Sequence, residues 1–213
     1  MKISHELMNF LEKNRIEVYE KQGSIMQEFE EFLALKNIYL SYDSALFHET
    51  IKGRMDLCDD VLTFYKRAIL PNEKISFLED LLVIGYDKNK LVEMVVEVFT
   101  SGENPSNLWE YGDLLFSMKK YKYLSQYIEI IQNKSYGHAR QMVVLLVGKS
   151  KKEEVIPILK DLLNDPDVYG HALDALTNFS GEDIETIMMQ YVDYKVTWVR
   201  NTAKRYLKKN GKL

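Results

Sequence analysis

The sequence predicts an all-α protein, and more specifically a right-handed α–α superhelix, a solenoid in which pairs of helices stack. Only four prolines and ten glycines interrupt 213 residues, and no long segment alternates apolar and polar residues as a half-buried strand does. In addition, the tetrapeptide at residues 136–139, Tyr-Gly-His-Ala, returns at residues 169–172. Self-similarity at a period in the low thirties is typical of stacked helical repeats.

A third, degraded copy of the tetrapeptide lies at residues 200–203, and a pair that includes an apolar residue follows each copy three residues later. The small last residue of the copies has a physical reason. A large side chain at a helix crossing would push the helices beyond their usual spacing of roughly 8–10 Å. We therefore expect the crossings of neighbouring first helices at Ala139, Ala172 and Ala203.

The first half of the chain reads as a series of amphipathic helices. Apolar residues recur at helical spacing in residues 3–20, 25–40, 55–69, 73–84 and 88–99, and a short segment around residues 44–51 leads to Gly53. Asn72 and Asp87 are plausible N-caps for the last two helices. Gly85 ends the helix between them, and the segment 100–107, rich in Gly, Pro, Ser and Asn, predicts a loop.

The second half continues in the same way and becomes regular from residue 134. We expect helices at about 107–118, 120–132, 136–147, 152–164, 184–191 and 196–209, with a further helix after the segment 165–168. In that segment Asp165 fits an N-cap, and Pro166 fits the first helical position, where its missing N–H has no cost. We predict one domain over residues 1–213, with divergent helix pairs in 1–133 and recognisable repeats with a C-terminal capping helix in 134–213.

Composition bounds the function. The net charge of −4 argues against a dedicated nucleic-acid binder, which carries a broad basic surface. Cys58 is the single cysteine, so no intramolecular disulfide forms, and a reducing compartment is expected. The N-terminus lacks the apolar core of a signal peptide, and the apolar runs are too short to span a bilayer. We expect a cytoplasmic protein without membrane contact.

The residues around the second copy resemble a known family. The segment 165–176, with Asp-Pro-Asp-Val followed by Ala172 and Ala175-Leu176, looks like the first helix of a HEAT repeat of the short bacterial type, also found in phycobilin lyases. Residues 154–163, with their early proline, look like its second helix. The resemblance covers about residues 135–209. The sequence departs from the family pattern at one position, where an arginine usually follows a valine. The first two copies have Tyr136 and Tyr169 there, and only the third copy has the arginine, Arg200. The resemblance implies a scaffold that holds a protein partner.

Three cations on the last predicted helix are candidate partner-binding residues. Arg200, Lys204 and Lys208 are four residues apart and therefore share one helix face. They can dock an acidic partner or a phosphate backbone. The alternative, which we favour, is a solvated capping helix whose cations suit the negative end of its dipole.

An aromatic cluster supplies the other candidate partner-binding residues, Trp109, Tyr121 and Tyr123. Tyrosine and tryptophan are common interface anchors, and they also fill cores between helices. Exposure on a concave groove and burial in the core therefore both remain open.

The other polar residues suggest no chemistry, and we predict no catalytic residue, no metal and no cofactor. His138 and His171 occupy equivalent positions, but only Asp174 is an obvious further ligand, and metal sites need three or four. The His-Glu pairs at residues 5–6 and 48–49 are read as chance, and Cys58 as a buried structural cysteine.

The sequence thus predicts a non-enzymatic scaffold or adaptor that binds a protein through its concave or C-terminal surface. The alternative is a DNA-binding or DNA-repair enzyme of the alkylpurine glycosylase kind, which also uses HEAT-like helices. Such an enzyme holds an extruded base with an aromatic residue and an acid. Trp109 with Asp113 is the pair at helical spacing that fits those roles.

Overall fold

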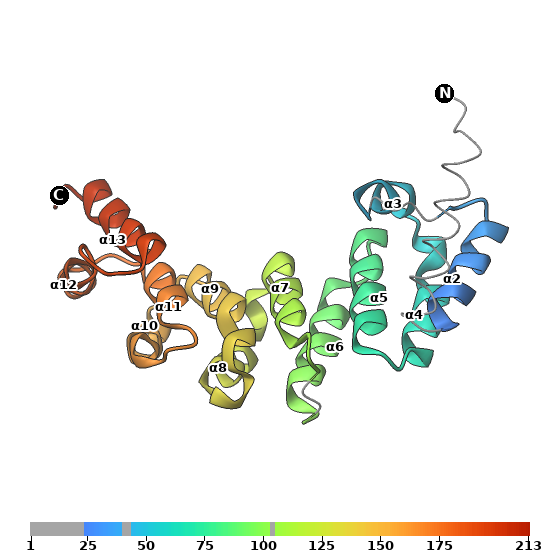
Figure 1. Ribbon diagram of the computed structural model, residues 1–213, viewed down its shortest axis with the longest axis horizontal. Helices are drawn as coiled ribbons and strands as arrows, with labels where there is room; N and C mark the ends of the chain where they lie inside the picture. The colour runs from blue at the N-terminus through green and yellow to red at the C-terminus, as the bar shows by residue number, and fades with distance from the viewer. Residues whose placement is uncertain (1–23, 40–43, 103–104) are drawn as a thin grey trace. The chain divides into compact units, whose positions relative to one another are not determined.

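The computed structural model describes residues 24–39, 44–102 and 105–213. Across these residues it contains twelve α-helices, five short 3₁₀ helices and no strand, which confirms the all-α prediction (Figure 1). The predicted helix at residues 3–20 lies outside the described residues. The chain divides into two compact units, residues 1–91 and 92–213. No described helix is both long and apolar enough to cross a membrane.

The first unit is built on an aromatic core. Its helices are α2 (Ser24–Leu35), α3 (Ser44–Ile51), η1 (Met55–Leu57), α4 (Cys58–Arg67) and α5 (Pro71–Ile84), and α6 (Lys88–Thr100) starts in it. Helix α5 packs against α3 and α4, and α2 packs against α4. The ring of Phe29 lies 5.0 Å from Phe64 and 5.1 Å from Phe77, so three helices meet at one buried aromatic cluster.

Helix ends in this unit test the predicted caps. Gly85 adopts φ 101° and its N–H bonds the Leu81 carbonyl, which confirms it as the end of α5. Asp87 Oδ1 accepts the Asn89 N–H at 2.8 Å and begins α6 as predicted. The Asn72 cap was wrong, since α5 begins at Pro71 with Leu70 as its N-cap, and the Glu73 carboxylate accepts the Leu70 N–H. Proline fixes the φ of the first helical residue, and this preference moved the start.

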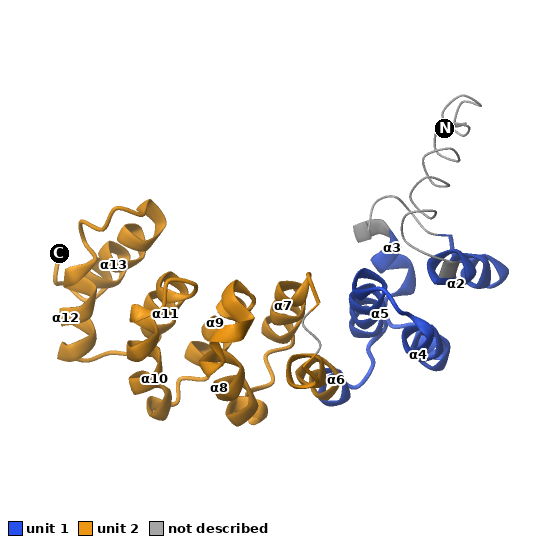
Figure 2. Ribbon diagram, turned by 60° about the horizontal axis from the view of Figure 1, so that its bottom comes forward, with its two compact units in different colours: residues 1–91 blue, residues 92–213 orange. Residues whose placement is uncertain are grey.

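The second unit arranges its helices in two layers (Figure 2). One layer holds α7 (Leu108–Met118), α9 (Gln141–Lys149), α11 (Tyr169–Leu176) and α13 (Thr197–Lys209), each packed against the next. The other holds α8 (Leu124–Gln132), α10 (Ile156–Asp161) and α12 (Glu182–Gln190), and each of these packs against the following first-layer helix. The 3₁₀ segments η2 (Tyr121–Tyr123), η3 (Lys134–Arg140), η4 (Glu153–Val155) and η5 (Leu162–Asn164) connect the layers. Because α7 packs in the same manner, the layering extends ahead of residue 134.

Glycines permit the closest approaches between first-layer helices. A Cβ at Gly148 would lie 2.6 Å from the Cβ of Ala175, and one at Gly112 would lie 2.7 Å from the Ala139 carbonyl oxygen. The expected alanines Ala172 and Ala203 are fully buried in this layer. The close contacts thus involve glycines and Ala175, and the third expected alanine, Ala139, is half-buried beside an open pocket.

The segment before α11 was predicted wrongly. The helix begins at Tyr169 with Val168 as its N-cap, so neither Asp165 nor Pro166 has the expected helical position. Instead, Asp165 Oδ1 accepts the Asp167 N–H at 3.1 Å, and the Asp165 carbonyl accepts the Tyr169 N–H at 2.9 Å. The segment is a turn, and the second oxygen of the Asp165 carboxylate pairs with a buried arginine described below.

Candidate functional site

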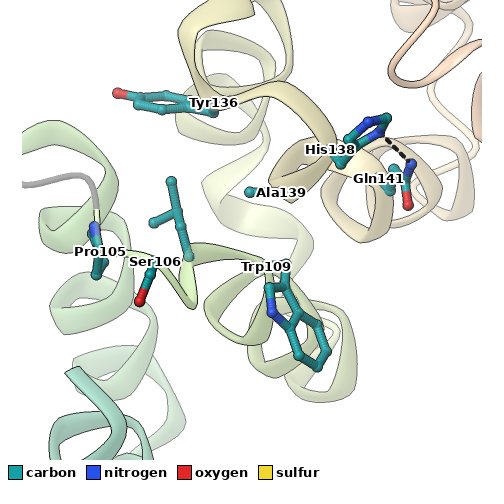
Figure 3. Close-up of a pocket in the computed structure, with 8 residues that line it drawn as sticks. Pro105, Ser106, Trp109, Tyr136, His138, Ala139 and Gln141 are labelled. Atoms are coloured by element: carbon teal, nitrogen blue, oxygen red, sulfur yellow. Dashed lines mark hydrogen bonds between the residues drawn. The ribbon is translucent and has the colours of Figure 1, made fainter.

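An open pocket of about 450 Å³ lies in the second unit where α7 begins beside η3 and α9 (Figure 3). Its walls include Pro105, Ser106, Trp109, Tyr136, His138 and Gln141. The Trp109 side chain is 54% exposed. The pocket therefore offers an aromatic face and several polar groups to solvent, with no acid or base buried inside it.

Tyr136 joins the pocket wall to α6. Its ring meets the ring of Phe99 edge-on at a centroid distance of 5.4 Å, and its hydroxyl donates to the Phe99 carbonyl. Because one side chain satisfies a helix-terminal carbonyl and packs on the same residue, Tyr136 is fixed in place.

His138 extends the pocket toward the following helix pair. Its Nδ1 lies 3.2 Å from the Asp167 carbonyl oxygen, and its Nε2 lies 3.3 Å from Asp167 Oδ1. Gln141 donates to the same carbonyl at 2.8 Å and lies 3.1 Å from His138 Nδ1 (Figure 3). The imidazole, whose side chain is 73% exposed, is thus held at the junction between two consecutive pairs.

A buried arginine supports that junction from beneath. Arg140 is fully buried, and its Nε donates to the Gly137 carbonyl at 3.0 Å. Its Nη1 donates to the Ile131 carbonyl at 2.9 Å and to Asp165 Oδ2 at 3.0 Å. Burial alone would raise the pKa of Asp165, but the hydrogen bonds from Arg140 and the Asp167 N–H outweigh it and lower that pKa.

The next junction along the layer is aromatic. The Trp198 ring lies 5.4 Å from the His171 ring and rests on Gly170, where an added Cβ would come within 2.5 Å of Trp198 Cζ2. Burial lowers the pKa of His171, and the nearby charge of His138 acts in the same direction, against an opposite effect from Asp174. Trp198 is 46% exposed, so its contacts with Gly170 and His171 hold the ring while part of it stays accessible to solvent.

Four of these side chains come from successive first-layer helices or the segment that leads into one of them. We call Trp109, His138, His171 and Trp198 the aromatic row. Trp109 and His138 share the pocket, and His138 lies near enough to His171 to affect its pKa. The His171 ring lies beside the Trp198 ring, with the two planes tilted by 57°. The row therefore crosses from α7 to α13, one residue for each first-layer helix or its leading segment.

The structure separates the sequence-predicted aromatic residues. Trp109 lies in the row, and Asp113 is exposed one turn further along α7, where burial and then the Glu110 charge raise its pKa. Tyr121 is 39% exposed. Tyr123 is buried, with its hydroxyl donating to Glu93 Oε1 at 2.7 Å, so it offers a partner little surface.

The predicted cations on α13 differ from one another. The Arg200 guanidinium donates to the Tyr194 carbonyl at 2.8 Å and so holds the preceding loop. Lys204 lies 3.9 Å from Asp193 Oδ1, and Lys208 is exposed. Sequence reasoning placed all three on one face, but their free charge is concentrated toward the end of the helix.

The remaining polar candidates have structural surroundings. Across the described residues, no three His, Cys, Asp or Glu side chains come together as metal ligands. Cys58 is buried, as predicted, and burial raises the pKa of its thiol. In the first unit His48 Nε2 lies 3.5 Å from Asp80 Oδ1. Their hydrogen bond raises the pKa of His48 and ties α3 to α5.

Sequence reasoning missed Arg140 and Trp198. Both had a signal in the sequence. Arg140 interrupts the first recognisable repeat just before its apolar run, and Trp198 occupies the place that Asp167 has one repeat earlier. Asp165, which pairs with Arg140, and His171, which contacts Trp198, each lie more than 20 residues away in the chain, and helix stacking brings them together.

Comparisons with protein-family models, with curated proteins and with solved structures find no match to this chain. The fold and the site alone define the class of protein, which is a layered helical protein with an aromatic row along its first layer.

Proposed function

We propose that the protein is a non-enzymatic scaffold or adaptor of the HEAT-like kind, a right-handed α–α superhelix that binds a protein partner in the cytoplasm. The layered second unit supports the superhelix, because helix pairs that each leave one apolar face uncovered bury it by stacking on the next pair. The resemblance of residues 135–209 to short bacterial HEAT repeats agrees with this arrangement.

The observation that carries the proposal is the aromatic row. Half-exposed tryptophan rings are frequent anchors of protein interfaces, and Trp198 is fixed on Gly170 and His171 before any partner arrives. A rigid aromatic side chain loses little conformational entropy on binding. The cations Arg200, Lys204 and Lys208 lie on the same terminal helix as Trp198, so the C-terminal end combines an anchor with charge that steers association.

The test compares variants in affinity capture from a lysate of the source organism, at low and moderate salt, with mass spectrometry of the retained proteins. We expect a stoichiometric protein that Trp109→Ala/Trp198→Ala loses and that Met189→Ala retains. Met189 is a matched control, because it is 49% exposed in the same unit on α12. Reversing Arg200, Lys204 and Lys208 tests the electrostatic contribution. Identical capture by all variants would contradict the proposal.

A second candidate is a DNA-directed function of the alkylpurine glycosylase kind. The exposed Trp109 with Asp113 one turn later favours it, because an aromatic face and an acid can hold an extruded base. Binding to duplex DNA should then fall steeply with salt, as phosphate contacts require, and should be lost in Trp109→Ala. Weak binding that is independent of Trp109 would leave the scaffold as the better proposal.

A further inference from the structure

We propose that the aromatic row is a docking surface for a proline-rich segment of a partner protein. The segment binds as a polyproline II helix, with a Lys or Arg over Trp109 and Asp113 and a proline against Trp198. This inference rests on the proposed function, because it names the kind of segment that the scaffold holds.

The spacing of the row carries the first step. Packed helices lie roughly 8–10 Å apart, and the glycine contacts at Gly112 and Gly148 show that first-layer helices approach closely. A polyproline II helix repeats every three residues and rises about 3.1 Å per residue, so its repeat is about 9 Å. The two periods agree. We therefore place every third residue of the ligand on the next member of the row, and about nine residues cover three steps of this general helix spacing.

The chemistry of the row carries the second step. Flat aromatic faces separated by shallow gaps are the surfaces that proline rings fill in known modes of peptide recognition. A polyproline II helix makes no internal hydrogen bonds, so its carbonyls accept from donors on the row, the indole N–H groups of Trp109 and Trp198. Trp198 suits the proline contact at the α13 end of the row, because its ring is half exposed and rests on Gly170.

Charged residues at the two ends of the row favour one orientation of the peptide, with its basic residue at the Trp109 end. Asp113 is exposed one turn from Trp109, and Glu110 lies on the same face. Burial is the larger cause of the raised pKa of Asp113, and repulsion from the Glu110 carboxylate acts in the same direction. A cation over the Trp109 ring relieves this repulsion and gains a cation–π contact. At the opposite end of the row, α13 carries Arg200, Lys204 and Lys208, which repel a second basic residue there.

The first experiment uses fluorescein-labelled synthetic peptides of about nine residues that carry proline at every third position and one terminal arginine. The comparison peptide has the same composition with its prolines clustered. The chain contains two tryptophans, and both lie in the row, so intrinsic emission reports contact directly. We expect the periodic peptide to bind about tenfold more tightly and to shift the emission to the blue. Equal affinity of both peptides would overturn the proposal.

Variants then test whether the peptide binds at the aromatic row. Trp198→Ala should weaken peptide binding at least about tenfold, as loss of an anchor does, whereas Met189→Ala should leave it unchanged. Gly170→Ala keeps the tryptophan but places a Cβ against its ring, so binding should weaken while the far-ultraviolet circular dichroism stays native. Normal binding by both row variants would contradict the assignment.

A last arm tests the basic residue and separates the two proposals. Asp113→Asn should cost up to about fivefold with the arginine peptide and nothing with a peptide that has alanine there. If Trp198→Ala loses a partner captured from the lysate but no periodic peptide binds the protein, the scaffold proposal stands and the polyproline proposal is wrong. Concentration-dependent dimerisation that Trp198→Ala abolishes would instead assign the row to a second copy of the chain.

Discussion

The two junctions that follow the repeated tetrapeptide use the same positions with opposite chemistry. At the first junction His138 meets Asp167, and at the second junction His171 meets Trp198. Asp167 and Trp198 occupy corresponding places in successive repeats. One junction is therefore a polar contact above a buried charge, and the other is a contact between two tilted aromatic rings.

The backbone differs as well, although the four residues are identical. Gly137 has φ 48° and ψ −131° at a kink within η3, whereas Gly170 lies inside the helix α11. The residue after each copy explains the difference. Arg140 needs buried acceptors for its guanidinium and takes one from the Gly137 carbonyl, while Leu173 is apolar and fully buried. Identical local sequence thus takes the conformation that the following side chain requires.

Arg140→Ala is expected to have the largest effect on this contrast. It removes the guanidinium that pairs with the buried Asp165 carboxylate, and loss of one partner of a buried ion pair lowers the free energy of unfolding by about 3–5 kcal/mol. Urea denaturation measures the change. The double variant Arg140→Leu/Asp165→Asn should recover part of the loss, since it leaves no uncompensated charge. A single variant as stable as the native protein would show that the pair contributes nothing.

Gly137→Ala and Gly170→Ala should differ, although they change the same residue in the same tetrapeptide. Alanine at Gly137 must adopt a backbone conformation that side chains disfavour, at a cost of about 1–3 kcal/mol. Alanine at Gly170 gains up to about 1 kcal/mol of helix propensity, which offsets the displacement of the exposed Trp198 ring. Thermal unfolding of both variants checks this, and equal destabilisation would refute the conformational explanation.

Tyr136→Phe should have a smaller effect. It deletes the hydroxyl that donates to the Phe99 carbonyl but keeps the edge-on ring contact, so the free energy of unfolding should fall by about 0.5–1.5 kcal/mol. Because Phe99 lies at the end of α6, amide exchange in that last turn should accelerate in the variant. Unchanged exchange there would count against the hydrogen bond.

The pH dependence of the second junction should be the smallest effect. Burial holds the pKa of His171 below its ordinary value of 6.5, so the unfolded chain binds more protons between the two values. Stability should therefore fall as the pH drops through about 6.5. His171→Gln should flatten this part of the profile. His48→Gln is an opposite control, because the raised pKa of His48 gives stability that is lost as the pH rises.

The sequence predicted the helices well because their apolar periodicity reports which face is buried, and this property is local. The ends at Gly85 and Asp87 were also predicted, since each depends on one residue's own conformational preference. The starts near Asn72 and Asp165 were misplaced for different reasons: the neighbouring Pro71 fixed the start of α5, and the Asp165 carboxylate is shared between the Asp167 N–H and the distant Arg140.

The candidate site was predictable only in part. Trp109 and Tyr121 were identified from composition and are exposed, whereas Tyr123, from the same cluster, is buried against Glu93. Spacing alone does not separate these outcomes, because a 3₁₀ segment at residues 121–123 changes which way successive side chains point. Trp198 was missed because His171 and Gly170, which seat it, belong to the preceding repeat.

The position of Arg140 has a consequence for local opening. Its guanidinium binds the Ile131 carbonyl near the end of α8, the Gly137 carbonyl in η3 and the carboxylate that precedes α11. If any one of these segments unfolds locally, the buried Arg140 guanidinium loses a hydrogen-bond partner. Local unfolding of one segment alone is therefore costly in free energy. Amide protons from α8 through α11 should consequently exchange with solvent in a single cooperative event, as one foldon rather than as separate helix pairs.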